Sequence, residues 1–153
     1  MVAILTGTVV LGFGGADMQQ EVKGFAQRFA YRIELARQQA LQRNREWGVY
    51  VEEQQYRFAE FDPELAEWVE QPNRPFRQGS IPDYLSLQLQ MEGLAELPFV
   101  GEGDVPRLLV FSSGEITPFT LYMSLNEGAP MWVVHSDGLG QTRVRRPHEL
   151  GTL

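Results

Sequence analysis

The chain has 153 residues, no cysteine and a net charge of −7, so it is long enough for one domain with a buried core and excludes a disulfide scaffold or a thiolate metal site. Fourteen acidic but only four basic groups lie between residues 48 and 127. This acidic body argues against a general nucleic-acid-binding role, because it would repel phosphate groups, and its simplest interpretation is solubility.

The first sixteen residues, MVAILTGTVVLGFGGA, carry no charge. They fall short of the roughly 18–20 apolar residues that span a membrane, and they lack the basic start of a secretory signal. Three interpretations stay open: the second half of a membrane helix, a buried strand, or a helix that docks on a partner. By composition alone, the valine and threonine content favours the strand.

An amphipathic helix is predicted from Asp17 to about Trp47. Its apolar residues recur at three- and four-residue steps: Val22, Phe25, Ala26, Phe29, Ala30, Ile33, Ala36 and Ala40. This spacing predicts a stripe that packs on a sheet. Gly14-Gly15 is a weak point, and the capping-box spacing of Asp17 and Gln20 predicts that the helix can restart there. Gly48 is the predicted C-cap.

Short antiparallel strands are expected after Gly48, because apolar residues then alternate with polar ones. The predicted runs are 49–51, 56–61, 84–91, 108–111, 119–123, 131–135 and 142–145. Residues 62–80 are expected to be irregular, with one helical turn at 64–68. Turns are predicted at 53–55, 112–114 and 137–138. Nothing alternates as strand, helix and strand, so the fold class is α+β.

No catalytic or metal-binding motif stands out, and we predict a non-enzymatic protein without cofactor or metal. His135 and His148 show no metal-ligand spacing, and Ser112 lacks the elbow of serine hydrolases. A group of carboxylates is predicted to be solvated surface, with calcium binding as the alternative. Its members are Glu52, Glu53, Glu60, Asp62, Glu64, Glu67 and Glu70.

Several segments, in this order and spacing, resemble the GspH-type minor pseudopilins of type II secretion. They are residues 25–29 (FAQRF), 35–40 (LARQQA), 47–49 (WGV), 56–58 (YRF), 109–119 (LVFSSGEITPF) and 137–140 (DGLG). The similarity extends from about Val2 to Pro147. The basic leader and the Gly-Phe-Thr-Leu-x-Glu start of pilin-like proteins are absent. We therefore expect the sequence to begin inside the helix, and cleavage and N-terminal methylation map onto none of its residues.

The resemblance implies a pilin-like α+β fold, with a long N-terminal helix packed on an antiparallel head of two small sheets. Residues 1–16 would be the rear half of an apolar transmembrane helix, and residues 17–153 the globular head, including amphipathic helix 17–47. The implied function is structural, as a minor pseudopilin at the pseudopilus tip that assembles through its N-terminal helix. The assembly residues would be Val2, Ala3, Ile4, Leu5, Val9, Val10, Leu11 and Phe13.

The implied partners are the other minor pseudopilins of the tip and the major pseudopilin. The implied location is the inner membrane, crossed once, with the head in the periplasm. An alternative stays open, because some related type IV minor pilins take up DNA through a basic C-terminal region. Its candidate residues are Arg143, Arg145 and Arg146.

Overall fold

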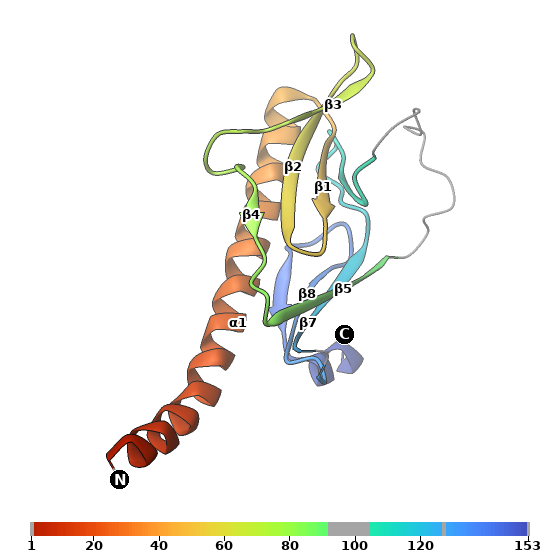
Figure 1. Ribbon diagram of the computed structural model, residues 1–153. Helices are drawn as coiled ribbons and strands as arrows, with labels where there is room; N and C mark the ends of the chain where they lie inside the picture. The colour runs from red at the N-terminus through yellow and green to blue at the C-terminus, as the bar shows by residue number, and fades with distance from the viewer. Residues whose placement is uncertain (1, 92–104, 127, 153) are drawn as a thin grey trace.

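One long helix packs along two antiparallel sheets in the computed structural model (Figure 1). The structure describes residues 2–91, 105–126 and 128–152, with the backbone alone at 2–16 and 151–152. The first part of the helix extends away from the sheets, and its second part lies against them. This arrangement confirms the predicted pilin-like α+β class with two small sheets.

Helix α1 (Val2–Arg43) is continuous for 42 residues, about 63 Å at 1.5 Å per residue. It contains residues 2–16 of the uncharged first segment, so the alternative of a buried strand is wrong. It also runs through Gly14-Gly15 without a new start at Asp17, so the predicted N-cap is wrong. A break would leave backbone N–H and C=O groups without hydrogen bonds at two new helix ends, whereas each interior glycine lowers helix stability by only about 1 kcal/mol.

The predicted apolar stripe is confirmed, because all eight of its side chains from Val22 to Ala40 are buried in the core. The helix ends at Arg43 and not near Trp47. Asn44 takes the left-handed conformation (φ 52°), and the Arg45 N–H donates to the Ala40 carbonyl (3.2 Å). This pattern is a Schellman C-cap.

Gly48 is therefore not the C-cap and lies inside a strand instead. A Cβ atom at this position would come within 2.4 Å of Pro106 Cγ. The glycine is needed for close packing rather than for ending the helix.

The first sheet has five strands in the order β3-β2-β1-β6, with β4 also on β2. The strands are β1 (Trp47–Val51), β2 (Gln55–Asp62), β3 (Glu67–Glu70), β4 (Gly79–Ser80) and β6 (Leu108–Val110). The predicted helical turn at 64–68 is wrong. Residues 63–66 form a turn with Ala66 at φ 54°, and Glu67 and Trp68 pair with Asp62 and Phe61.

The second sheet has four strands in the order β5-β7-β8-β9. They are β5 (Leu85–Met91), β7 (Phe119–Leu125), β8 (Trp132–Ser136) and β9 (Arg143–Arg145). The alternation read from the sequence is confirmed in β7, where Phe119, Leu121 and Met123 are buried. A short 3-10 helix, η1 (Pro147–Thr152), ends the described chain and was not predicted.

The core lies between α1 and the two sheets. Edge-to-face ring contacts connect Phe29 to Tyr56, Tyr56 to Phe58, Phe58 to Phe76 and Phe76 to Trp47. At the second sheet, Glu34 Oε1 on α1 accepts the N–H of Thr142, the residue before β9, at 2.7 Å. The helix is thus fixed to both sheets, and the head and the second half of α1 form one packed unit.

Candidate functional site

The eight predicted assembly residues lie in the first three or so turns of α1. They precede the part of the helix that contacts the sheets, in the segment that projects from the head in Figure 1. Their role in assembly stays a prediction, as does the division at residue 16. Across the described residues, no single helix has a stretch long and apolar enough to cross a membrane.

The helix meets the head through polar contacts as well as through the apolar stripe. The Tyr84 hydroxyl lies 3.4 Å from Glu21 Oε2, and burial followed by this carboxylate raises the pKa of Tyr84. Two residues further along α1, the Lys23 ammonium lies 5.1 Å from the centre of the Trp132 ring. These contacts mark where the exposed part of the helix gives way to the packed part.

Glu60 is a buried carboxylate that sequence analysis placed on the solvated surface, and that prediction is wrong. Its side chain accepts two bonds from Arg43 (2.7 and 3.0 Å) and one from the Trp47 indole N–H (2.9 Å). Hydrogen bonding to Glu60, with the attraction between the charges, raises the pKa of Arg43. The network joins the end of α1 to β1 and β2. No motif or spacing in the sequence indicated that these three side chains would meet.

The other acidic residues of this region behave largely as predicted. Glu64, Glu67 and Glu70 are exposed. Glu52 pairs with Arg57, and hydrogen bonds from Gln55 and Arg57 lower the pKa of Glu52. In the described ranges, no three carboxylate or histidine groups come together as a metal site would require. Calcium binding gains no support from this geometry.

The three C-terminal arginines do not form one open patch. Arg143 and Arg145 lie on β9, opposite His135 and Val133, and share a strand face, as expected from alternation. The Arg146 guanidinium lies 4.0 Å from the centre of the Trp132 ring, and its backbone N–H donates to Glu149. Arg143 is exposed, whereas Arg145 and Arg146 are half-buried. Their binding to DNA stays a prediction.

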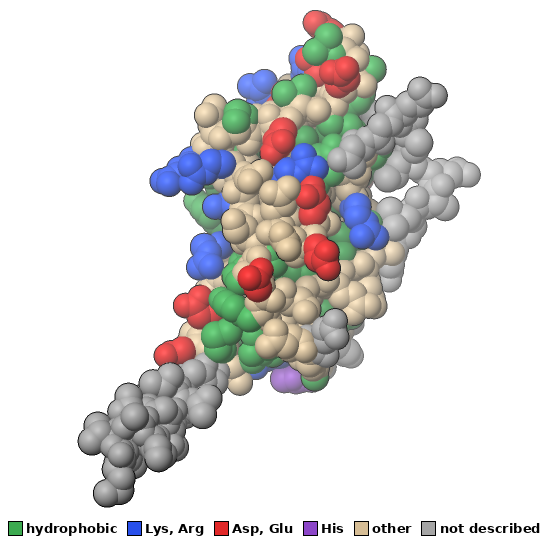
Figure 2. Space-filling view, in the orientation of Figure 1, with side chains coloured by type: hydrophobic (Ala, Val, Ile, Leu, Met, Phe, Trp, Pro, Cys, Tyr) green, Lys and Arg blue, Asp and Glu red, His purple; other side chains and the backbone are tan. Residues whose placement is uncertain are grey.

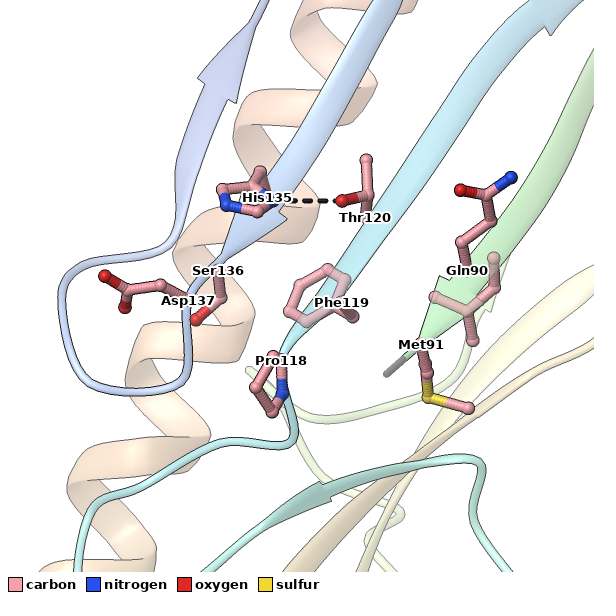
Figure 3. A pocket seen from close by; sticks show the side chains of 9 residues that line it. Gln90, Met91, Pro118, Phe119, Thr120, His135, Ser136 and Asp137 are labelled. Atoms are coloured by element: carbon pink, nitrogen blue, oxygen red, sulfur yellow. Dashed lines mark hydrogen bonds between the residues drawn. The ribbon is translucent and has the colours of Figure 1, made fainter. Parts of the chain in front are cut away.

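A depression of about 590 Å³ lies across β5, β7 and β8 (Figure 3). His135 faces Thr120 on the neighbouring strand, with His135 Nδ1 and Thr120 Oγ1 at 2.9 Å, which confirms the prediction of a satisfied strand histidine. Asp137 accepts the N–H groups of Gly140 and Leu139 in the next turn, and these bonds lower its pKa. The polar groups here stabilise the hairpin rather than converge on a reacting centre.

A long N-terminal helix that projects from a head of two small antiparallel sheets, and whose second half builds the core of that head, defines a pilin-like protein. The family model described as type II transport protein GspH matches residues 26–140. The chain belongs to this family. The family consists of structural pseudopilins, which agrees with the prediction of a non-enzymatic protein.

Relatives and solved structures agree with this assignment. The type II secretion system protein H of Pseudomonas aeruginosa is 29% identical over 154 residues, covering 94% of this chain and 87% of that protein. The protein of the same name from Aeromonas hydrophila is 24% identical over 165 residues, covering 97% and 90%. The crystal structure of the minor pseudopilin EPSH from the type II secretion system of Vibrio cholerae superposes with a TM-score of 0.71 at 28% identity, covering 85% and 96%.

The solution structure of E. coli GspH shares the fold, with a TM-score of 0.63 at 22% identity over 86% of this chain and 90% of that one.

Proposed function

We propose that this protein is a minor pseudopilin of a type II secretion system that joins the pseudopilus tip through its N-terminal helix. One observation carries the proposal. The uncharged residues 2–16 continue without a break into the helix that forms the head's core. The names of the relatives from Pseudomonas aeruginosa and Vibrio cholerae support the same system.

In this proposal, the apolar start of α1 first lies in the inner membrane and the head lies in the periplasm. During assembly, the segment exchanges lipid for the helices of the major pseudopilin and the other tip subunits. Both surroundings are apolar, so the transfer need not expose the segment to water. Because the second half of α1 is fixed to both sheets, movement of the helix carries the head with it.

The test places one charge in the apolar segment, with Val10→Asp. A charged side chain costs about 3 kcal/mol at the centre of a membrane helix, so we expect the variant to leave the membrane fraction and to be absent from sheared pseudopilus fibres. Secretion should fall in a strain that depends on this protein. Quantitative immunoblots of fractions and of secreted enzyme measure both effects.

Gln38→Asp is the matched control, because Gln38 is an exposed position on the packed half of α1. It adds the same charge to the same helix and should leave fractionation and secretion unchanged. The thermal unfolding of the head should be the same in both variants. Normal fibre incorporation of Val10→Asp would overturn the proposal.

A further inference from the structure

Two arginines on α1 and two on the segment before β4 gather around one pocket. They surround a pocket of about 390 Å³ that the helix forms with the segment leading into β4. The residues lining it are Arg28, Tyr31, Arg32, Arg74, Pro75 and Arg77. In Figure 2, basic side chains stand along this edge of the molecule, where α1 passes the segment before β4. We call the four arginines the arginine cluster.

The fold places each half of the arginine cluster firmly. Arg28 and Arg32 are one helical turn apart, so they lie on the same face of α1. On the other side, Phe76 is buried against Trp47 and Phe58, with ring centroids 4.6 and 5.6 Å away. This anchor leaves the residues on either side of it, Arg74 and Arg77, exposed at the rim.

Tyr56 holds the helix half of the arginine cluster. Its hydroxyl accepts a hydrogen bond from Arg32 Nη1 at 2.8 Å. Burial raises the pKa of Tyr56, and the positive charges of Arg32 and Arg28 oppose that rise. The Tyr56 ring also lies so close to Gly79 that a Cβ there would come within 2.3 Å of it. The Arg32 side of the pocket is therefore held by a bond to a buried side chain.

The arginine cluster has no internal counter-charge. Within the described ranges, Arg37, Arg43, Arg45 and Arg57 each form an ion pair, whereas no ion pair involves the four members of the cluster. Four unpaired guanidinium groups repel one another. In a chain of net charge −7, this local excess of positive charge indicates an anionic group from outside, which arginines bind with two parallel hydrogen bonds.

We propose that the arginine cluster docks an acidic polypeptide segment of a neighbouring subunit in the fibre, an inference that rests on the proposed function. The pocket volume suits one or two carboxylate side chains. Tyr31, which is 65% exposed, and Pro75 supply flat apolar surface between the cations, as a peptide requires.

Two other anionic surfaces fit less well. Asp17, which is exposed, and Glu21 lie on α1 between the uncharged segment and the arginine cluster, and they would repel an anionic lipid surface. Figure 2 shows acidic side chains in that place, next to the grey atoms. A nucleic acid would meet the repulsion of the whole acidic body.

The test measures binding of a fluorescent hexaglutamate peptide to the full chain in non-ionic detergent, by anisotropy at low and at physiological salt. The test variant is Arg28→Gln/Arg74→Gln/Arg77→Gln, which keeps the Arg32–Tyr56 bond. We expect it to weaken binding by about tenfold or more, as lost charge-assisted contacts do. The matched control, Arg143→Gln/Arg145→Gln/Arg146→Gln, removes the same charge elsewhere and should leave binding unchanged.

Three results would overturn the inference. One is equal binding of hexaglutamate to the wild type and the test variant, with both folded by circular dichroism. Another is cluster-dependent binding to vesicles of anionic lipid without binding to the peptide. The third is cluster-dependent self-association, which would make a second copy the occupant.

The inference can fail separately from the proposed function. Val10→Asp should bind hexaglutamate like the wild type, and the arginine variant should still fractionate with membranes. Equal peptide binding by the wild type and the arginine variant, together with a secretion defect in Val10→Asp, would refute the docking site and leave the assembly role supported.

Discussion

At the scale of single residues, Glu60 is where the end of the helix is fixed to the first sheet. The carboxylate satisfies the buried Trp47 indole N–H and receives two bonds from Arg43. A buried carboxylate is retained only when its oxygens are hydrogen-bonded, because desolvation of an unpaired charge is costly. Glu60 therefore helps to determine where α1 ends and β1 begins.

Glu60→Leu should lower the free energy of unfolding by about 1–3 kcal/mol, because it leaves the buried Trp47 indole N–H without an acceptor. Glu60→Gln keeps an acceptor at the same place and should cost less. Chemical denaturation followed by tryptophan fluorescence gives both values. A leucine variant as stable as the wild type would contradict this role of the carboxylate.

Gly79→Ala should destabilise the protein by about 1–3 kcal/mol, because overpacking forces buried groups apart. The added methyl group would meet the Tyr56 ring at 2.3 Å, and that ring is held by Arg32 and the core. Gly140→Ala is the control, since the nearest atom would lie at an ordinary 3.5 Å. Thermal unfolding compares the two variants, and equal midpoints would count against the close packing at Gly79.

At the scale of elements, α1 has two halves with different surroundings. The second half buries its apolar stripe in the head, and the first half extends from it. Gly12, Gly14 and Gly15 lie near the junction. Glycine lowers helix stability by about 1 kcal/mol per residue relative to alanine, so we expect this part of the helix to bend or melt locally during packing into a fibre.

Gly14→Ala combined with Gly15→Ala should therefore alter pseudopilus assembly without changing the stability of the head. Both residues precede Val22, where the apolar stripe begins, so the thermal midpoint should match that of the wild type. Secretion assays and fibre yields measure the effect on assembly. Normal secretion by the double variant would show that these glycines are not needed for packing of the helix into the fibre.

At the scale of the whole molecule, charge separates the two functional alternatives. The body is acidic overall, and the basic groups near the C-terminus are divided between an exposed strand edge and the Trp132 ring. A DNA site needs basic groups that act together on the phosphate backbone. The three arginines do not form a single surface of that kind.

We expect no gel shift of a DNA duplex at micromolar protein, even at low salt, where phosphate contacts are strongest. A shift that weakens steeply with salt and disappears in Arg143→Gln/Arg145→Gln/Arg146→Gln would restore the DNA-binding alternative. The test variant of the arginine cluster serves as a second control, because it removes three positive charges from another face.

Much of the fold could be read from local patterns. The helical stripe from Val22 to Ala40 and the alternation of Phe119, Leu121 and Met123 both follow from burial of one face of an element. Strand β3 was not predicted, because Glu67-Trp68-Val69-Glu70 shows no clear alternation of apolar and polar residues. These residues are extended because they pair with β2. The predicted C-cap at Gly48 was wrong because Asn44 takes the left-handed conformation that was expected of a glycine.

The sequence by itself determined the order of elements, the apolar stripe and the family resemblance, because these depend on residues close along the chain. For the uncharged start, composition alone favoured a strand and the family resemblance implied a helix, and the structure decided for the helix, which continues as α1. It also decided that Glu60 is buried and that Arg28 and Arg74 line the same pocket. The physical reason is that burial and counter-charge belong to neighbours in space, which are brought together only when the sheets pack on the helix.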